Sequence, residues 1–185
     1  MDTSAVSPDP AGLKALAHPV RLRMLGLLRI DGPATATALA ERLGLNSGAT
    51  SYHLRQLAQH GFIVDDESRG NGRERWWRAA HDSTRTEGDA GDPEAMTAYV
   101  YAVAALYADL QQRALVERQF LPVEWQQAST LSDWAVRLTP ARAKALLEAL
   151  VGVIEGEEED LEGTEGAVPF VVQLSTYPMP GSVLP

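Results

Sequence analysis

Apolar residues recur along most of this chain at the three- and four-residue spacing of helices, so the pattern predicts a mainly helical protein. Residues 1–10 are small, polar and proline-bearing, and we expect them to form a flexible arm. A first helix is predicted from Ala11. A second is predicted from Pro19, because proline is tolerated at the first position of a helix. This second helix is apolar on most sides and should be buried.

Two further helices follow, separated by a glycine turn. Thr35 or Thr37 should cap a short helix that ends at Gly44, a residue suited to the left-handed position after a helix. Asn46 or Ser47 should cap the next helix, which is expected to end near residue 59. Its apolar residues share one face, so the opposite face is predicted to be exposed to solvent.

A β-hairpin is predicted after this helix. Residues 62–64 and 75–78 are rich in side chains that favour strands, and Asn71-Gly72 between them favours a tight turn. Trp76 and Trp77 should point to opposite faces of their strand, so we expect one of the two to lie in the core.

A polar linker over residues 81–92 leads to a long helix predicted over about residues 93–119. This helix carries an apolar stripe that a lone surface helix would not need, and we expect a second copy of the chain to cover it. The residues assigned to dimerisation are Met96, Tyr99, Val100, Val103, Tyr107 and Leu110.

The remainder is predicted to be a small α/β unit. It would contain a strand at residues 131–138, a helix opened by Thr139-Pro140, a solvated acidic run and a last strand at residues 168–177. The fold class is therefore α+β and mainly α. One domain is expected over residues 11–80 and a second over residues 93–185.

Charge divides the chain unevenly. The formal net charge is −9, yet residues 1–80 hold 10 Lys and Arg against 8 Asp and Glu, whereas the rest holds 6 against 17. Four of the basic residues are arginines clustered between Arg69 and Arg78. This asymmetry favours a nucleic-acid partner for the first part and not for the second.

Several classes of function are disfavoured by composition. No cysteine is present, which excludes thiolate metal sites and suits a cytoplasmic protein. The four histidines do not pair within a helix turn, so we expect neither a histidine metal site nor a cofactor. There is no phosphate-binding glycine loop, Gly-x-Ser-x-Gly or HExxH, and we therefore expect no enzyme. Neither a signal peptide nor an apolar run of about 20 residues is seen, so no membrane role is expected.

The helix over residues 47–59 and the basic hairpin after it follow an order by which small domains bind DNA. The helix can enter a major groove while the ribbon binds the flanking backbone or minor groove. Arginine can reach a guanine edge or a phosphate, and hydroxyl groups can bind either. The predicted DNA-binding residues are Ser47, Gly48, Ser51, Tyr52, Arg55, Arg69, Arg73 and Arg75, while Arg78 is expected to pair with Asp65 or Asp66.

Three segments in this part also carry a family resemblance: LKALAHPVRLRMLGLL, ALAERLGLNSGATSYHLRQL and GFIVDDESRGNGRERWWRA. Over about residues 11–80 the chain resembles ArsR-type winged helix–turn–helix regulators, and its composition is similar to that of actinobacterial members with an added C-terminal domain. The resemblance implies a DNA-binding homodimer, usually a repressor, whose affinity changes with a signal. It places the second helix of the motif in a major groove, with His53 beside the residues named above. Metal-sensing members use a cysteine-containing ligand pair, which this chain lacks.

Two alternatives stay open at this point. The winged domain could be a protein-interaction module without direct DNA binding, which a pI of about 4.9 suits better than a DNA partner. The C-terminal unit could serve only the core and the dimer, or its aromatic residues could line a pocket for a small organic effector. Those residues are Phe120, Trp125, Trp134, Phe170 and Tyr177. The predicted partners are thus a pseudo-palindromic double-stranded DNA operator, a second copy of the chain and such an effector.

Overall fold

The computed structural model describes residues 5–69, 74–86, 91–161 and 163–183, and its chain divides into two compact units. The N-terminal unit spans Asp2–Glu117 and the C-terminal unit spans Arg118–Pro185. The boundary between these units therefore follows the long helix, whereas the sequence analysis placed the domain boundary before it, at the linker 81–92. The protein is mainly helical, as expected.

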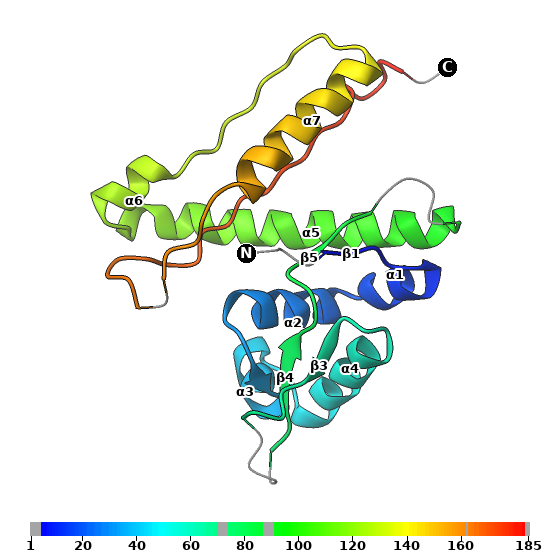
Figure 1. Ribbon diagram of the computed structural model, residues 1–185, viewed down its shortest axis with the longest axis vertical. Coiled ribbons are helices and arrows are strands. Elements are labelled where there is room, and N and C mark those ends of the chain that lie inside the picture. Colours follow the sequence, from blue (N-terminus) through cyan, green and yellow to red (C-terminus); the bar gives the residue numbers. More distant parts are fainter. Residues whose placement is uncertain (1–4, 70–73, 87–90, 162, 184–185) are drawn as a thin grey trace. The chain divides into compact units, whose positions relative to one another are not determined.

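The described part of the N-terminal unit contains five helices, which are labelled in Figure 1. Their bounds are α1 (Pro10–Leu16), α2 (Pro19–Ile30), α3 (Ala36–Leu43), α4 (Ser47–Gln59) and α5 (Pro93–Glu117). The first four begin at side-chain caps, in which Asp9, His18, Thr35 and Asn46 accept a hydrogen bond from a backbone N–H of the first turn. Gly44, at a φ of 65°, ends α3 in the left-handed conformation that its sequence predicted.

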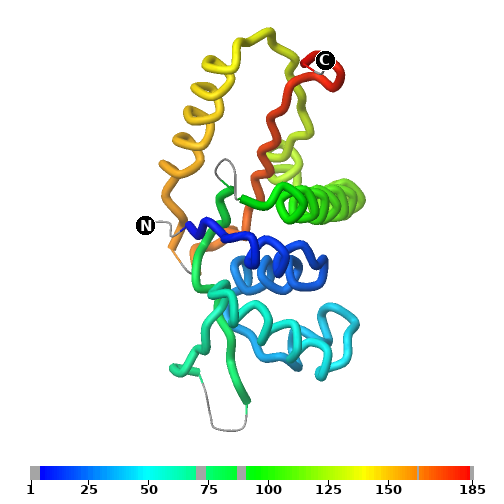
Figure 2. Tube along the Cα trace, turned by 90° about the vertical axis from the view of Figure 1, so that its right-hand side faces the viewer, coloured from blue at the N-terminus to red at the C-terminus, as the bar shows by residue number. Residues whose placement is uncertain are grey.

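A three-stranded antiparallel sheet follows the helices, with the order β2–β4–β3. Its strands are β2 (Ala34–Thr35), β3 (Ile63–Asp65) and β4 (Trp76–Ala79). The described ends of the β3–β4 ribbon extend beyond the helices (Figure 2), which is the geometry of a wing. Residues 70–73, the predicted tip, lie outside the described residues.

Two short strands correct the predictions for the arm and the linker. β1 (Ala5–Val6) pairs in parallel with β5 (Ser83–Thr84), so residues 5–10 are part of the fold and the segment 81–92 is more than a connector. The side chain of Arg29 fixes this pair to α2: its Nε donates to the carbonyl of His81 and its Nη2 to the hydroxyl of Thr84. Burial lowers the pKa of the Arg29 guanidinium, yet arginine stays charged at neutral pH.

The core of the N-terminal unit lies between α5 and the other helices of this unit, α1 to α4, with residues of the sheet. Ala95, Tyr99 and Ala102 of α5 are buried, and α5 packs mainly on α1 and α2. Other buried residues are Leu13, Leu16, Met24, Leu25, Leu28, Leu39, Leu54, Leu57, Phe62, Ile63 and Trp77. One tryptophan of the hairpin, Trp77, is thus in the core, as predicted.

This packing corrects part of the predicted dimerisation stripe. Tyr99 is covered by its own chain, and Met96 and Val103 pack against the same core. Met96, Tyr99 and Val103 face the core because α1 and α2 offer α5 its nearest apolar surface. Val100 and Tyr107 are exposed, and Leu110 is half-buried.

The C-terminal unit contains η1 (Arg118–Phe120), α6 (Val123–Ala128) and α7 (Pro140–Glu155). The helix opened by Thr139-Pro140 is confirmed, with the Thr139 hydroxyl accepting from the N–H of Arg142. The strands predicted at residues 131–138 and 168–177 are wrong, because neither segment has a ladder partner among the described residues. A strand requires hydrogen bonds to a neighbour, which alternation of apolar residues cannot supply. The described part of this unit is therefore helical with extended connections.

Candidate nucleic-acid interface

Helix α4 is held in place from its first turn. The side chain of Asn46 accepts from the N–H of Ala49 at 2.8 Å, and the hydroxyl of Thr50 donates to the Asn46 carbonyl at 3.0 Å. Thr50, Leu54 and Leu57 are buried in the core. Because these three residues share one face, the remaining face of α4 is directed to solvent.

The outward face carries the residues that the sequence assigned to it. Ser47, Gly48, Tyr52 and Arg55 are exposed, and Ser51 is half-buried. Tyr52 leaves 51% of its surface exposed, which is high for an aromatic residue. Arg55 forms neither a hydrogen bond nor an ion pair with any residue that the structure describes, so its guanidinium is available to a ligand.

His53 lies at the inner edge of this face, beside a second histidine. The ring centroids of His18 and His53 are 4.6 Å apart, and Tyr52 meets His53 edge-on at 5.4 Å. The Nδ1 atom of His53 is buried without a hydrogen-bond partner in the described part of the chain. Burial lowers the pKa of both histidines, and the nearby Arg21 acts in the same direction. His18 serves as the cap of α2, with Nδ1 accepting from the N–H of Val20.

The arginines of the wing are partly neutralised within the chain. Arg75 donates from Nε to Oδ2 of Asp65 at 2.6 Å, and its guanidinium lies 4.0 Å from the ring centroid of Trp77. Nε of Arg69 lies 3.8 Å from Oδ2 of Asp66. The two aspartates were expected to bind Arg78 instead, and that prediction is wrong.

The strand register gives the reason. Asp65 is the partner of Trp77, so its side chain shares a face of the ribbon with Trp77 and Arg75, whereas Arg78 belongs to the opposite face with its partner Val64. The side chain of Arg78 instead reaches the neighbouring carbonyl of Ala79 at 3.5 Å. Arg73 lies outside the described residues.

The predicted aromatic pocket in the C-terminal unit does not form. Phe120, Trp134 and Tyr177 are 78%, 82% and 75% exposed. Only Trp125 and Phe170 come together, with stacked rings whose centroids are 6.1 Å apart. The five residues were expected to converge because three of them, Trp134, Phe170 and Tyr177, were placed on strands, and those strands are absent from the described residues.

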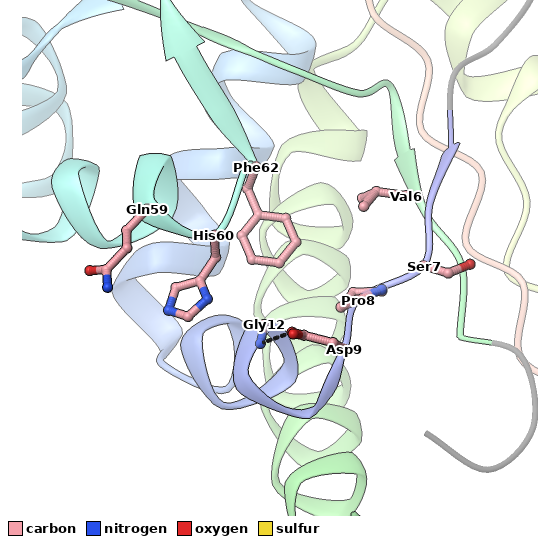
Figure 3. A pocket seen from close by; sticks show the side chains of 8 residues that line it. All are labelled: Val6, Ser7, Pro8, Asp9, Gly12, Gln59, His60 and Phe62. Atoms are coloured by element: carbon pink, nitrogen blue, oxygen red, sulfur yellow. Dashed lines mark hydrogen bonds between the residues drawn. The ribbon is translucent and has the colours of Figure 1, made fainter. Parts of the chain in front are cut away.

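A cavity of about 370 Å³ opens elsewhere, between the N-terminal segment and the end of α4 (Figure 3). It is lined by Val6, Ser7, Pro8, Asp9, Gly12, Gln59, His60 and Phe62. The sequence analysis missed it because its lining comes from segments about 50 residues apart. The Asp-Pro pair that precedes α1 was the one local signal, since it marks a capped helix start.

The comparison with protein families matches residues 16–65 to a model described as a helix-turn-helix domain. The HTH-type transcriptional regulator NmtR of Mycobacterium tuberculosis (strain ATCC 25618 / H37Rv) is 40% identical over 68 residues. That alignment covers 37% of this chain and 56% of NmtR, so the chain spans about half the length of this relative.

The N-terminal unit contains an ArsR-type winged helix–turn–helix domain.

Solved structures also match part of this chain. One is the homodimeric DNA-binding domain of a possible ArsR-family regulator from Mycobacterium bovis, with 25% identity and a TM-score of 0.35. That match covers 54% of this chain and 76% of the other. Another is a mutant of ZitR from Lactococcus lactis, with 16% identity, a TM-score of 0.34 and coverage of 75% and 82%.

The described residues lack two other kinds of feature. No helix there is both long and apolar enough to cross a membrane. No group of three or more His, Asp or Glu in these residues is arranged to hold a metal ion.

Proposed function

We propose that this protein is a homodimeric transcriptional regulator that binds a pseudo-palindromic DNA operator, most simply as a repressor in the cytoplasm. The observation that carries the proposal is the outer face of α4, where an unpaired Arg55 stands among exposed hydroxyl groups. The ArsR-type domain and the 40% identity to a transcriptional regulator support it.

In this proposal α4 enters the major groove. Arg55 donates to a guanine edge or a phosphate, and the hydroxyls of Ser47 and Tyr52 bind phosphates or bases. Gly48 has only Asn46 within 4 Å of where a Cβ would stand, so the DNA backbone can approach the first turn of the helix closely.

The wing is assigned to the flanking backbone and minor groove. Arg69 and Arg75 are more than half exposed, so their guanidinium groups can exchange an aspartate partner for a phosphate. Each exchange should change the free energy of DNA binding only slightly. The ion pair with aspartate must be broken first, and an exposed ion pair is worth only about 0–1 kcal/mol. We therefore assign most of the discrimination between sequences to α4.

A second copy would be held through α5. This helix exposes Val100, Tyr101, Leu115 and Val116 in the single chain, and such a stripe is suited to a two-fold partner. A dimer of winged domains would present two α4 helices to successive major grooves, about 34 Å apart.

The test is binding of the full-length chain to the DNA upstream of its own gene. Fluorescence anisotropy should show tighter binding to this duplex than to a scrambled duplex. Affinity should fall steeply between about 50 and 200 mM salt, as expected when several phosphate contacts release counterions. A chain that binds neither duplex at low salt would overturn the proposal and favour a protein-interaction module instead.

A further inference from the structure

The cavity described above lies between two parts of the chain to which the DNA-binding proposal assigns no role. One wall runs from Val6, the last residue of β1, to Gly12 in α1. The other wall is the end of α4 together with Phe62, the residue before β3. Figure 3 shows His60 and Phe62 on one side, with Val6, Pro8 and Asp9 on the other. A ligand seated here would contact both the N-terminal segment and the last turn of the proposed recognition helix.

The charged group of the cavity is the carboxylate of Asp9. Its Oδ1 accepts from the N–H of Gly12 at 2.7 Å, which fixes the carboxylate against the first turn of α1. Its Oδ2 has no hydrogen-bond or ion-pair partner in the part of the chain that the structure describes. Neither lysine nor arginine lines the cavity. The lining can thus offer a ligand one solvent-exposed carboxylate, which the N–H of Gly12 holds in place.

The end of α4 adds partial negative charge to the same space. The carbonyls of Leu57 and Ala58 are taken by Phe62 and Gly61, but those of the final residues, Gln59 and His60, have no such backbone partner in the described chain. Unpaired carbonyls at a helix C-terminus favour a positive charge. Two independent features of the cavity, one from α1 and one from α4, therefore select for a cation.

The apolar part of the lining limits the size of the ligand. Val6, Pro8 and Phe62 supply its apolar surface, and about 370 Å³ is near the lower end of the range for small-molecule sites. A Cβ on Gly12 would come within 3.1–3.2 Å of Asp9, Pro8 and Phe62. The absence of a side chain at Gly12 is thus what allows these residues to meet around the opening.

We propose that this cavity binds a small organic amine, with its ammonium group on Asp9 and the last carbonyls of α4 and its apolar body against Pro8 and Phe62. Occupation would tie the end of α4 to α1, and so would alter how α4 is presented to DNA. The binding site stands by itself, whereas its role as an effector site rests on the proposed DNA-binding function.

Benzylamine is a suitable probe, with benzyl alcohol and benzoate as neutral and anionic counterparts of the same size. In the full-length chain, backbone amide signals of Gly12, His60 and Phe62 should shift with benzylamine and saturate in the low millimolar range. Benzyl alcohol should bind about tenfold more weakly, because a charge-assisted hydrogen bond is lost, and benzoate should not bind. No saturable shift at these residues up to about 10 mM benzylamine would overturn the site.

Asp9→Asn is the decisive variant, because asparagine still caps a helix and the fold is kept. It should weaken benzylamine binding about tenfold and leave the binding of benzyl alcohol unchanged. Asp92→Asn makes the corresponding change at the N–H of Ala95, at the start of α5 and outside the cavity lining, although it also loses the ion pair of Asp92 with Lys14 at 2.8 Å. It should bind benzylamine as the wild type does. Equal affinities for Asp9→Asn and the wild type would contradict the proposed role of this carboxylate.

The effector role is tested separately, by measuring operator affinity with and without saturating benzylamine. A change of at least about threefold in the wild type, absent in Asp9→Asn, is expected for coupled sites. Saturable, Asp9-dependent binding with unchanged operator affinity would refute the effector role and leave the site intact. A chain that takes up the amine but binds no DNA would refute the proposed function alone.

Discussion

At the scale of single residues, Arg55 is the side chain whose loss should be most informative. Arg55→Ala removes a long donor without touching the core, so we expect a loss of about 1–3 kcal/mol in operator binding and a smaller difference between operator and scrambled DNA. Anisotropy titrations with both duplexes measure this change. Arg142→Ala, an equally exposed arginine of α7, should leave both affinities unchanged. Unaltered operator affinity in Arg55→Ala would exclude this face of α4 from recognition.

Asp65 should restrain DNA binding, because it occupies the guanidinium of Arg75. Asp65→Asn frees this cation and removes a negative charge near the phosphates. Binding to operator and scrambled duplexes should both tighten, and the salt slope should steepen by about one. Asp109→Asn breaks a similar ion pair with Arg113 on α5, at 3.2 Å, and provides the matched control. A weaker affinity in Asp65→Asn would contradict a backbone role for the wing.

The histidine pair predicts a dependence of stability on pH. Because burial lowers the pKa of His18 and His53 from 6.5, the unfolded chain binds protons more readily than the folded one. Stability should therefore be full above about pH 6.5 and decline as the pH falls below it. Urea unfolding at a series of pH values measures the decline, which His53→Gln should reduce. A decline that is unchanged in His53→Gln would rule out a contribution from this residue.

The residue scale also shows what the sequence could and could not reveal. Caps were predictable, because Thr35 and Asn46 are each followed by an apolar pattern at helical spacing. The aspartate partners of the wing were not, because they depend on the register of β3 against β4. The unpartnered Nδ1 of His53 depends on how α2 packs against α4, which no local pattern records.

At the scale of elements, the cap of α4 sets where the proposed recognition helix begins. Asn46→Ala removes the acceptor for the Ala49 N–H and should cost about 0.5–2 kcal/mol of stability. Urea unfolding followed by circular dichroism measures this loss. Asn46→Ser keeps a capping oxygen and should lose much less. Equal destabilisation by the two substitutions would mean that another property of Asn46 matters.

Helices were predicted well and short strands poorly, for a physical reason. A helix satisfies its backbone hydrogen bonds within its own segment, so local periodicity suffices to predict α2, α4 and α7. A strand depends on a partner elsewhere in the chain. The two-residue strands β1 and β5 carry no periodic signal, whereas the alternating residues 131–138 lack a partner in the described chain.

At the scale of the whole molecule, the proposed dimer should depend on the exposed side of α5. Val100 is 52% exposed there, and Val100→Glu should place a charge in the interface and yield monomers at micromolar concentration. Light scattering after size exclusion measures the mass. Val136→Glu alters a valine that is 65% exposed in the C-terminal unit, and we expect it to remain dimeric. A wild-type chain that is monomeric under these conditions would refute the dimer itself.

The unit boundary could not be read from the apolar stripe of α5, because such a stripe can be covered by the same chain or by another. The stripe of α5 is divided: Ala95, Tyr99 and Ala102 face the winged domain, while Val100 and Tyr101 do not. Composition did place the change in charge after residue 80, but that change does not coincide with the change in packing at Glu117.

The contact between α1 and α5 has a consequence for synthesis on the ribosome. Leu13 and Leu16 emerge early, yet the helix that packs on α1 begins about 80 residues later. Domains fold as units during synthesis, and distant contacts close slowly. The first helix should therefore remain sensitive to protease in nascent chains that stop at residue 80, and become protected once residue 117 has left the exit tunnel. In this chain α1 leaves the ribosome before α5, and its packing is completed only after α5 has emerged.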